Sequence, residues 1–149
     1  MDERTWIVDA ANVVGARPDG WWRDRAAAAL RLHKHLSKLC SGVSASRTAD
    51  RGDLPAQVVL VLEGAARAGI VAGPDPDTHT GPRTGRLVVV HAPGSGDDAV
   101  VEAAVEAVRR QRGAVLVITA DRELRGRVHA VGAATAGPGW LWALLDNNS

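Results

Sequence analysis

The sequence contains no tyrosine and no phenylalanine, so its five tryptophans are its only aromatic side chains. Its one cysteine, Cys40, excludes an intramolecular disulfide and fits a reducing compartment, so we expect a cytoplasmic location. No apolar run is long enough to span a bilayer, and no membrane partner is expected. The chain begins with Met-Asp-Glu-Arg and enters a strand pattern directly, so no signal peptide is expected either.

Lysine is also scarce, because Lys34 and Lys38 are the only lysines among 18 basic residues. The remaining positive charge is arginine, which binds phosphate bidentately but is also enriched by GC-rich genomes. The formal net charge is only +1, so the overall charge does not indicate a nucleic-acid partner. A chain of 149 residues with 46% apolar content is expected to form one domain, residues 1–149, with a full hydrophobic core.

Four apolar, strand-like runs each end at or just before a carboxylate. The predicted strands are about Thr5–Asp9, Gln57–Leu62, Arg86–His91 and Ala114–Thr119. The acids at their ends are Asp9, Glu63, the tandem pair Asp97-Asp98, and Asp121. If the strands are parallel neighbours, these acids gather at the carboxyl edge of the sheet, where open α/β sheets bind ligands.

Helix and loop patterns separate these strands. We predict helices from Gly20 to Leu39 with Asp19 as its cap, from Asp97 or Asp98 to Arg110, and from Asp121 to Val131. Residues 41–55 and 73–86 have the composition of loops, the second of them mobile. A short strand near 133–136 and an apolar segment at 140–145 complete the chain. This alternation predicts an α/β fold whose parallel sheet is covered by helices on both faces.

Carboxylates that gather at one edge repel each other and require a cation. A cluster of oxygen ligands suits Mg²⁺ or Mn²⁺, and metal-bound carboxylates in a cleft indicate phosphate-ester chemistry. A simpler interpretation is that Asp9 caps a turn and that the other acids cap helices. That interpretation requires an acid to fall by chance at the end of each of the four strands. It also leaves one acid of the tandem pair unexplained, because a helix cap needs only one.

The order and spacing of four motifs resemble those of the NYN branch of the PIN-like nucleases, in particular the small bacterial YacP-type NYN proteins. These motifs are Asp9-x-x-Asn12, Glu63-Gly64, Gly96-Asp97-Asp98 and Thr119-Ala120-Asp121-Arg122-Glu123-Leu124. The resemblance covers nearly the whole chain and implies a three-layer α/β/α sandwich with a central parallel sheet. It also implies a ribonuclease activity that depends on Mg²⁺ or Mn²⁺.

The resemblance also implies roles for individual residues. It makes Asp9 the first metal ligand and Asn12 its polar companion, with Asp97 and Asp98 as the acidic pair. Asp121 is the last strand-end acid, so the implied metal ligands are Asp9, Asp98 and Asp121. Glu63 is carried over as a further ligand from an acid-glycine pair after the second strand. The segment 19–25 lies outside the family motif.

Three further residues are candidates for binding substrate, which the resemblance implies to be single-stranded or structured RNA. Arg17 and Arg122 are placed in sequence to contact phosphates near the site, although Arg122 also fits an exposed helix position. Of the adjacent Trp21 and Trp22, one is a candidate for stacking on a nucleobase, and we assign this role to Trp22. The alternative is that one tryptophan packs in the core and the other packs on the loop. Whether the chain forms a homodimer is left open.

Other functions compete with a ribonuclease. A haloacid-dehalogenase-like phosphatase needs a second Asp two residues after the first, where Ala11 stands. It also needs a later lysine, and both lysines here fall in the first predicted helix. A degenerate PIN-like module that binds RNA or a protein without cutting remains an alternative, as does a metal-dependent nucleotide phosphohydrolase.

Overall fold

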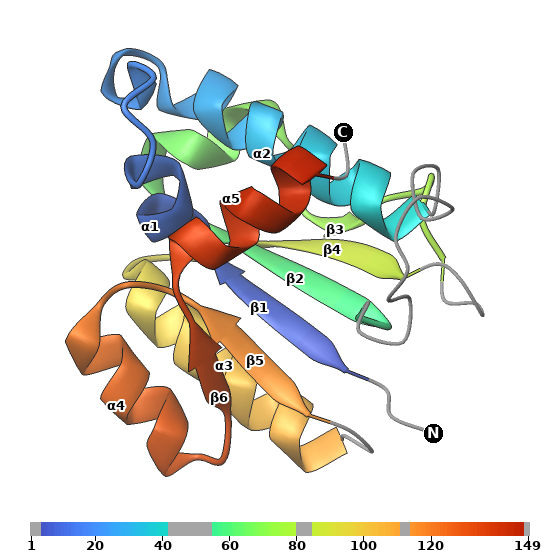
Figure 1. The fold of residues 1–149 in the computed structure, drawn as a ribbon, viewed down its shortest axis with the longest axis vertical. Helices are drawn as coiled ribbons and strands as arrows, with labels where there is room; N and C mark the ends of the chain where they lie inside the picture. The colour runs from blue at the N-terminus through green and yellow to red at the C-terminus, as the bar shows by residue number, and fades with distance from the viewer. Residues whose placement is uncertain (1–3, 42–54, 80–84, 111–113, 148–149) are drawn as a thin grey trace.

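The computed structural model describes residues 4–41, 55–79, 85–110 and 114–147, which form a central sheet with helices on both sides (Figure 1). Its strands are β1 (Thr5–Asp9), β2 (Gln57–Leu62), β3 (Gly73–Pro74), β4 (Arg86–His91), β5 (Val115–Ile118) and β6 (Ala134–Ala136). The strand order is β3-β4-β2-β1-β5-β6, and every pair is parallel except β3 with β4. The predicted α/β fold with a central parallel sheet is therefore confirmed.

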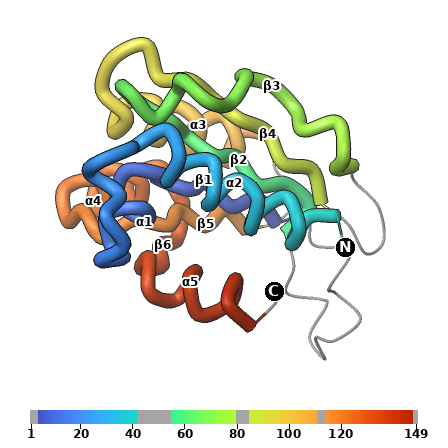
Figure 2. The backbone as a smooth tube through the Cα atoms, turned by 90° about the horizontal axis from the view of Figure 1, so that it is seen from above, coloured from blue at the N-terminus to red at the C-terminus, as the bar shows by residue number. Residues whose placement is uncertain are grey.

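The central strands are apolar on both faces because helices cover both faces. In β1, Trp6 and Val8 belong to one core cluster and Ile7 belongs to the other, and all three are buried. The first cluster lies under α1 (Ala10–Gly15), α2 (Arg25–Ser41) and α5 (Pro138–Asn147). The second lies under α3 (Gly96–Arg110) and α4 (Arg122–Ala130). Figure 2 shows α5 and α3 separated by the strands of the sheet.

The first long helix begins later than the sequence predicts. Gly20 has a φ of 80°, in the left-handed region that glycine adopts readily. The chain turns there and then forms a short 3₁₀ helix, η1 (Trp21–Arg23). The helix α2 then starts at Arg25, and the Asp24 Oδ1 atom accepts a hydrogen bond from the Ala27 backbone N–H at 3.0 Å. The prediction that Asp19 caps this helix is wrong, because Asp24 does so.

The segment 73–79 is more ordered than the predicted mobile loop. The strand β3 pairs with β4, and the Asp75 backbone N–H donates to the Leu87 carbonyl at 2.8 Å. Asp75 also accepts a hydrogen bond from the Ser37 hydroxyl of α2 at 2.7 Å. Residues 80–84 of the predicted loop 73–86 lie outside the described residues. The predicted loop at 41–55 also lies almost wholly outside them.

The remaining elements agree with the predictions to within a few residues, apart from α1 and the 3₁₀ helix η4 (Gly64–Gly69), which the sequence analysis did not anticipate. Within the described ranges, no helix is both long enough and apolar enough to cross a membrane.

Candidate active site

Asp9 occupies the centre of the candidate site, at the end of the central strand β1. It is only 4% exposed, and such burial requires its carboxylate to have hydrogen-bond partners. Its Oδ2 atom accepts hydrogen bonds from the Asn12 amide at 2.8 Å and from the Thr119 hydroxyl at 2.9 Å. The short helix α1 places Asn12 one turn after Asp9. The carboxylate is therefore held by the helix that follows it and by the residue after the neighbouring strand β5.

Asp121 is joined to the same network. Its backbone N–H donates to the Thr119 hydroxyl oxygen at 3.1 Å, and its Oδ1 atom caps α4 by accepting from the Leu124 N–H at 3.1 Å. The Ala120 N–H donates to the Asn12 amide oxygen at 3.3 Å. The ends of β1 and β5 are thereby bound together through side chains as well as through the sheet.

Glu63 approaches the site from β2 on the other side of β1. Its Oε2 atom accepts a hydrogen bond from the Gly96 N–H, the first residue of α3, at 2.8 Å. A Cβ atom at position 96 would lie 2.8 Å from the Glu63 carboxyl carbon, so only glycine leaves room for this contact. The glycine of the Gly96-Asp97-Asp98 motif therefore serves the close approach of Glu63 to the start of α3.

The tandem acids of α3 have different surroundings. Asp97 is half-buried and lies in the electric field of Asp121 and Glu63. The Asp98 carboxylate instead accepts a hydrogen bond from Arg127 of α4 at 2.9 Å, and its side chain is 68% exposed. The structure thus places Asp9, Asp97, Asp121 and Glu63 at the same edge of the sheet, while Asp98 pairs with an arginine.

The electrostatics agree with this convergence. Burial raises the pKa of Asp9 above its ordinary value, the hydrogen bonds from Thr119 and Asn12 oppose the shift, and the Asp97 charge adds to it. The pKa of Asp97 is also raised, first by burial and then by Asp121 and Glu63. The nearby Arg127 lowers the pKa of Asp97, and Glu123 raises it. Mutual repulsion of this kind is relieved when a cation binds between the carboxylates.

The donor set fits a hard divalent cation, although the side chains are not gathered around a single point. All the candidate ligands are oxygen atoms, which suits Mg²⁺ or Mn²⁺. Asp121 and Glu63 each use one carboxylate oxygen in the hydrogen bonds above, and the other oxygen takes no hydrogen bond from the described residues. Across the described part of the chain, no three His, Cys, Asp or Glu side chains are close enough, as placed, to hold a metal ion.

A cleft of about 380 Å³ opens beside the acids. Glu63 and Gly64 line it from the end of β2, and Ala10 and Ala11, which follow Asp9, line it from α1. Trp21 of η1 and Arg25 of α2 form part of the same wall. The cleft therefore lies at the carboxyl edge of the sheet and shares Glu63 with the acid group.

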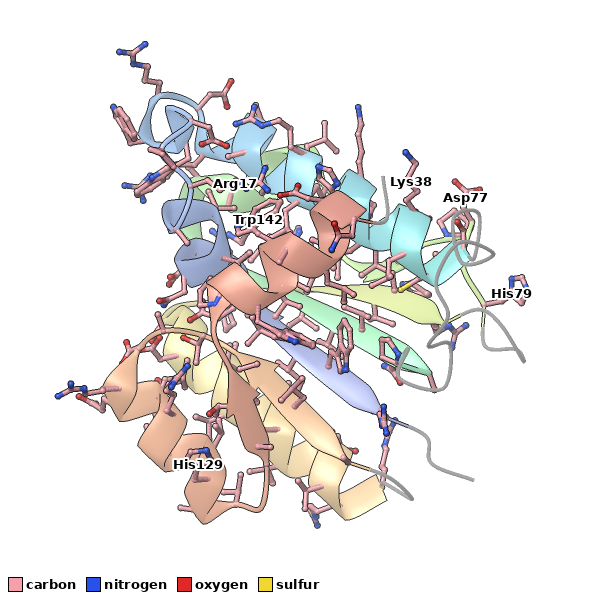
Figure 3. The ribbon with its side chains drawn as sticks, viewed as in Figure 1. Arg17, Lys38, Asp77, His79, His129 and Trp142 are labelled. Atoms are coloured by element: carbon pink, nitrogen blue, oxygen red, sulfur yellow. The ribbon has the colours of Figure 1, made fainter. Side chains whose placement is uncertain are left out.

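The three predicted substrate-binding residues lie outside the lining of this cleft. The Arg17 guanidinium stacks on the Trp142 ring of α5, 3.8 Å from its centroid, and forms an ion pair with Asp146 (Figure 3). Trp22 is 55% exposed and touches Trp21 edge to face. Arg122 is exposed at the first position of α4.

Three residues of the site were not selected by the sequence analysis. Thr119 was noted only as the end of a strand, yet its hydroxyl connects Asp9 with Asp121. Trp21 and Arg25 line the cleft, but both lie in the segment 19–25, outside the family motif. The signal for Thr119 was a polar residue at the end of a buried strand, whereas no sequence pattern separates Trp21 from Trp22.

Comparison with known proteins identifies the fold as that of the YacP-type PIN-like proteins. Two similar solved structures are of Rae1 (YacP) from Bacillus subtilis. One, a tryptophan-to-leucine mutant, aligns with a TM-score of 0.63 and 18% identity over 99% of this chain and 76% of that chain. The other aligns with a TM-score of 0.57 and 20% identity over 99% of this chain and 75% of that chain.

These structures bear the family name that the motifs predicted, and at this level of identity the likeness establishes the fold. No protein-family model matches the chain, and no curated protein sequence matches it.

Proposed function

We propose that this protein is a metal-dependent ribonuclease that hydrolyses RNA phosphodiester bonds with Mg²⁺ or Mn²⁺. The observation that carries the proposal is that Asp9, Asp97, Asp121 and Glu63 all lie at the carboxyl edge of the sheet, beside a cleft. The YacP-like fold supports the same class of activity. A cytoplasmic location and an RNA partner belong to this proposal.

The side chains of the site have distinct roles in the proposal. Asp9, Asp97, Asp121 and Glu63 would hold the metal, and the exposed Asp98 is less well placed than Asp97 because it pairs with Arg127. A bound divalent ion supplies an activated water and stabilises charge on the phosphate. Asn12 and Thr119 fix the orientation of Asp9, and outer hydrogen bonds of this kind tune metal sites in general.

A second function is a module that binds RNA without cutting it. One observation favours it: as placed, no three candidate ligands among the described residues are close enough for a metal ion. In that case the carboxylates would serve the fold through the caps and hydrogen bonds described above. The two functions differ in one observable: a ribonuclease cleaves bound RNA when a divalent metal is added, and a binding module does not.

Cleavage of a short, end-labelled single-stranded RNA decides between them. We expect cleavage with micromolar Mn²⁺ or millimolar Mg²⁺, and protection by EDTA. Asp9→Asn and Asp121→Asn should each lower the rate by orders of magnitude while the protein stays folded. Asp97→Asn should be more harmful than Asp98→Asn, because the pKa of Asp97 is raised by burial and by neighbouring acids, whereas Asp98 is exposed and pairs with Arg127.

Asp77→Asn is a suitable control for these variants. Asp77 is exposed and lies on the side of the molecule away from α1 (Figure 3). Equal cleavage by wild type and by both Asp9→Asn and Asp121→Asn would indicate a contaminating nuclease. Binding of the RNA without cleavage under either metal would favour the second function.

A further inference from the structure

The cleft beside the acids has the size and composition of a nucleotide-binding site. Its volume of about 380 Å³ lies near the lower end of the range of roughly 300–1,000 Å³ for small-molecule pockets. Its wall is mostly apolar, with alanines from α1, α2 and η4, and it has one aromatic ring and two charged side chains. A mainly apolar wall with a few polar groups is typical of small-molecule sites, and the aromatic ring adds a surface on which a planar base can stack.

Trp21 supplies the aromatic ring, and its neighbours hold it in place. The indole is half-buried, with its six-membered ring 3.7 Å from the position that a Cβ of Gly15 would take, at the end of α1. Trp22 packs against Trp21 nearly perpendicularly, with ring centroids 6.0 Å apart. A tryptophan held on two sides loses little side-chain freedom when a base stacks on it, and this favours binding.

Arg25 supplies positive charge on the same wall. Its guanidinium lies 5.4 Å from the Trp21 ring centroid, and within the described part of the chain it forms no ion pair with a carboxylate. Arg17, Arg31, Arg110 and Arg127 are each paired with an acid in the same ranges. Arg25 is thus available to a phosphate in the cleft, whose lining also includes Glu63.

We propose that this cleft binds an unpaired nucleobase of the RNA, with the base stacked on Trp21 and an adjacent phosphate bound by Arg25. The inference rests on the proposed function and names its substrate class as single-stranded RNA. Glu63 lines the cleft and also belongs to the acid group, so a nucleotide held there brings the RNA backbone to the acids. A base within a duplex is stacked on both faces and paired, so it would have to leave the helix before entering.

The test measures binding separately from cleavage. A short single-stranded RNA carrying the fluorescent base 2-aminopurine is titrated with the protein in EDTA, and quenching of the base reports stacking. Trp21→Leu keeps an apolar side chain but removes the ring, and it should weaken binding about tenfold and abolish most of the quenching. Trp21→Phe should retain most of both. Trp140→Leu is the matched control, because Trp140 is an exposed tryptophan of α5 outside the lining of the cleft, and it should change binding by less than about twofold.

Arg25 is tested by the salt dependence of binding. Arg25→Gln should weaken binding. It should also flatten the slope of log Kd against log salt by the amount expected for the loss of about one phosphate contact. Arg109→Gln is its control, because Arg109 is an exposed arginine in the last turn of α3, away from the edge where that helix begins. A duplex RNA of the same length should bind more weakly than the single strand, and its binding should not depend on Trp21.

The outcomes separate this inference from the proposed function. If Trp140→Leu weakens binding as much as Trp21→Leu, or if the duplex binds as tightly as the single strand, the cleft does not hold a base. If RNA is cleaved with metal and Asp121→Asn stops it, yet Trp21→Leu binds normally, the ribonuclease stands and this inference fails. If Trp21 governs binding but no metal supports cleavage, the base site stands and the ribonuclease fails.

Discussion

Thr119 is the residue on which the arrangement of the acids depends most directly. Its hydroxyl donates a hydrogen bond to Asp9 and its oxygen accepts one from the Asp121 backbone. It is completely buried, so loss of the hydroxyl would leave the Asp9 carboxylate short of one partner where water does not readily replace it. One neutral side chain thus sets the position of two acids without adding charge to a site that is already negative.

Asp9→Asn should stabilise the metal-free protein at neutral pH. Because burial raises the pKa of folded Asp9, its ionisation is less favourable in the folded than in the unfolded chain. The metal-free protein therefore loses stability as pH rises from the ordinary Asp pKa of about 3.9 through the raised folded pKa, and the loss persists above it. Asparagine cannot ionise, and its amide oxygen still accepts hydrogen bonds.

Urea denaturation in EDTA measures this effect. The denaturation midpoint of Asp9→Asn should exceed that of wild type at neutral pH, and the difference should shrink toward zero as the pH falls below about 4. Asp77→Asn, at an exposed position, serves as the control. A variant that is less stable than wild type at neutral pH would show that the charge of Asp9 is compensated in the folded protein.

Gly96→Ala should impair the site while leaving the fold intact. The added methyl would lie within 3 Å of the Glu63 carboxyl group, which is the flexible end of a side chain and can move away. Gly96 has no positive φ, and at such a position Gly→Ala stabilises by about 0.4–1 kcal/mol by restricting the unfolded chain, so the melting temperature should hold or rise slightly. Metal affinity should fall if Glu63 is a ligand, as measured by Mn²⁺ titration.

Glu63→Gln provides the matching background for this test. In Glu63→Gln, adding Gly96→Ala should have no further effect on metal affinity, since both changes act on the same carboxylate. Gly126→Ala, at a helix position with open space around it, should leave metal affinity unchanged. Unaltered affinity in both Gly96→Ala and Glu63→Gln would remove Glu63 from the set of ligands.

Among the elements, α5 has the clearest influence on the site because it holds α1 in place. The Trp142 indole N–H donates to the Val13 carbonyl at 2.8 Å, and Arg17 lies over the ring of the same tryptophan (Figure 3). The helix α1 starts directly after Asp9 and carries Asn12. A change in the packing of α5 would therefore shift α1, and a shift of α1 would move the Asp9 carboxylate.

Arg17→Ala should lower stability and leave the salt dependence of RNA binding unchanged. The variant loses a cation–π contact and a partly exposed ion pair, each worth about 0.5–1 kcal/mol or less. A loss near 1 kcal/mol lowers the melting temperature by about 2–4 °C in a domain of this size. Thermal unfolding and filter binding across a salt series measure the two effects, and a flatter salt slope would restore Arg17 as a phosphate contact.

The sequence predicted the strands and the edge where the acids meet, because these follow from runs of apolar residues and from the rules of parallel sheets. It did not predict which of two adjacent residues faces the site. Asp97 and Asp98 follow the same strand, and the choice depends on Arg127, 29 positions further along the chain. Trp21 and Trp22 differ only through the turn at Gly20, whose left-handed conformation delays α2 and makes Asp24, not Asp19, its cap.

For the whole molecule, metal binding should appear as a gain in stability. A ligand that binds only the folded state raises the melting temperature, and a bound cation also relieves the repulsion around Asp97. Saturating Mn²⁺ at about 100 times its Kd should add about 2.7 kcal/mol. Calorimetry with and without Mn²⁺ measures the rise, which should be largely absent in Asp121→Asn. A flat response at millimolar Mg²⁺ and micromolar Mn²⁺ would count heavily against a metalloenzyme.

The strand order has a consequence for when the site comes into existence. Asp9 and Thr119 are 110 positions apart, and β1 completes its pairing only when β5 is present. During synthesis the N-terminal half of the chain emerges first, so the first acid exists long before its hydroxyl partner and the last acid. A half-made or partly unfolded chain therefore carries no assembled acid group, and the proposed cutting of RNA is confined to molecules that have finished folding.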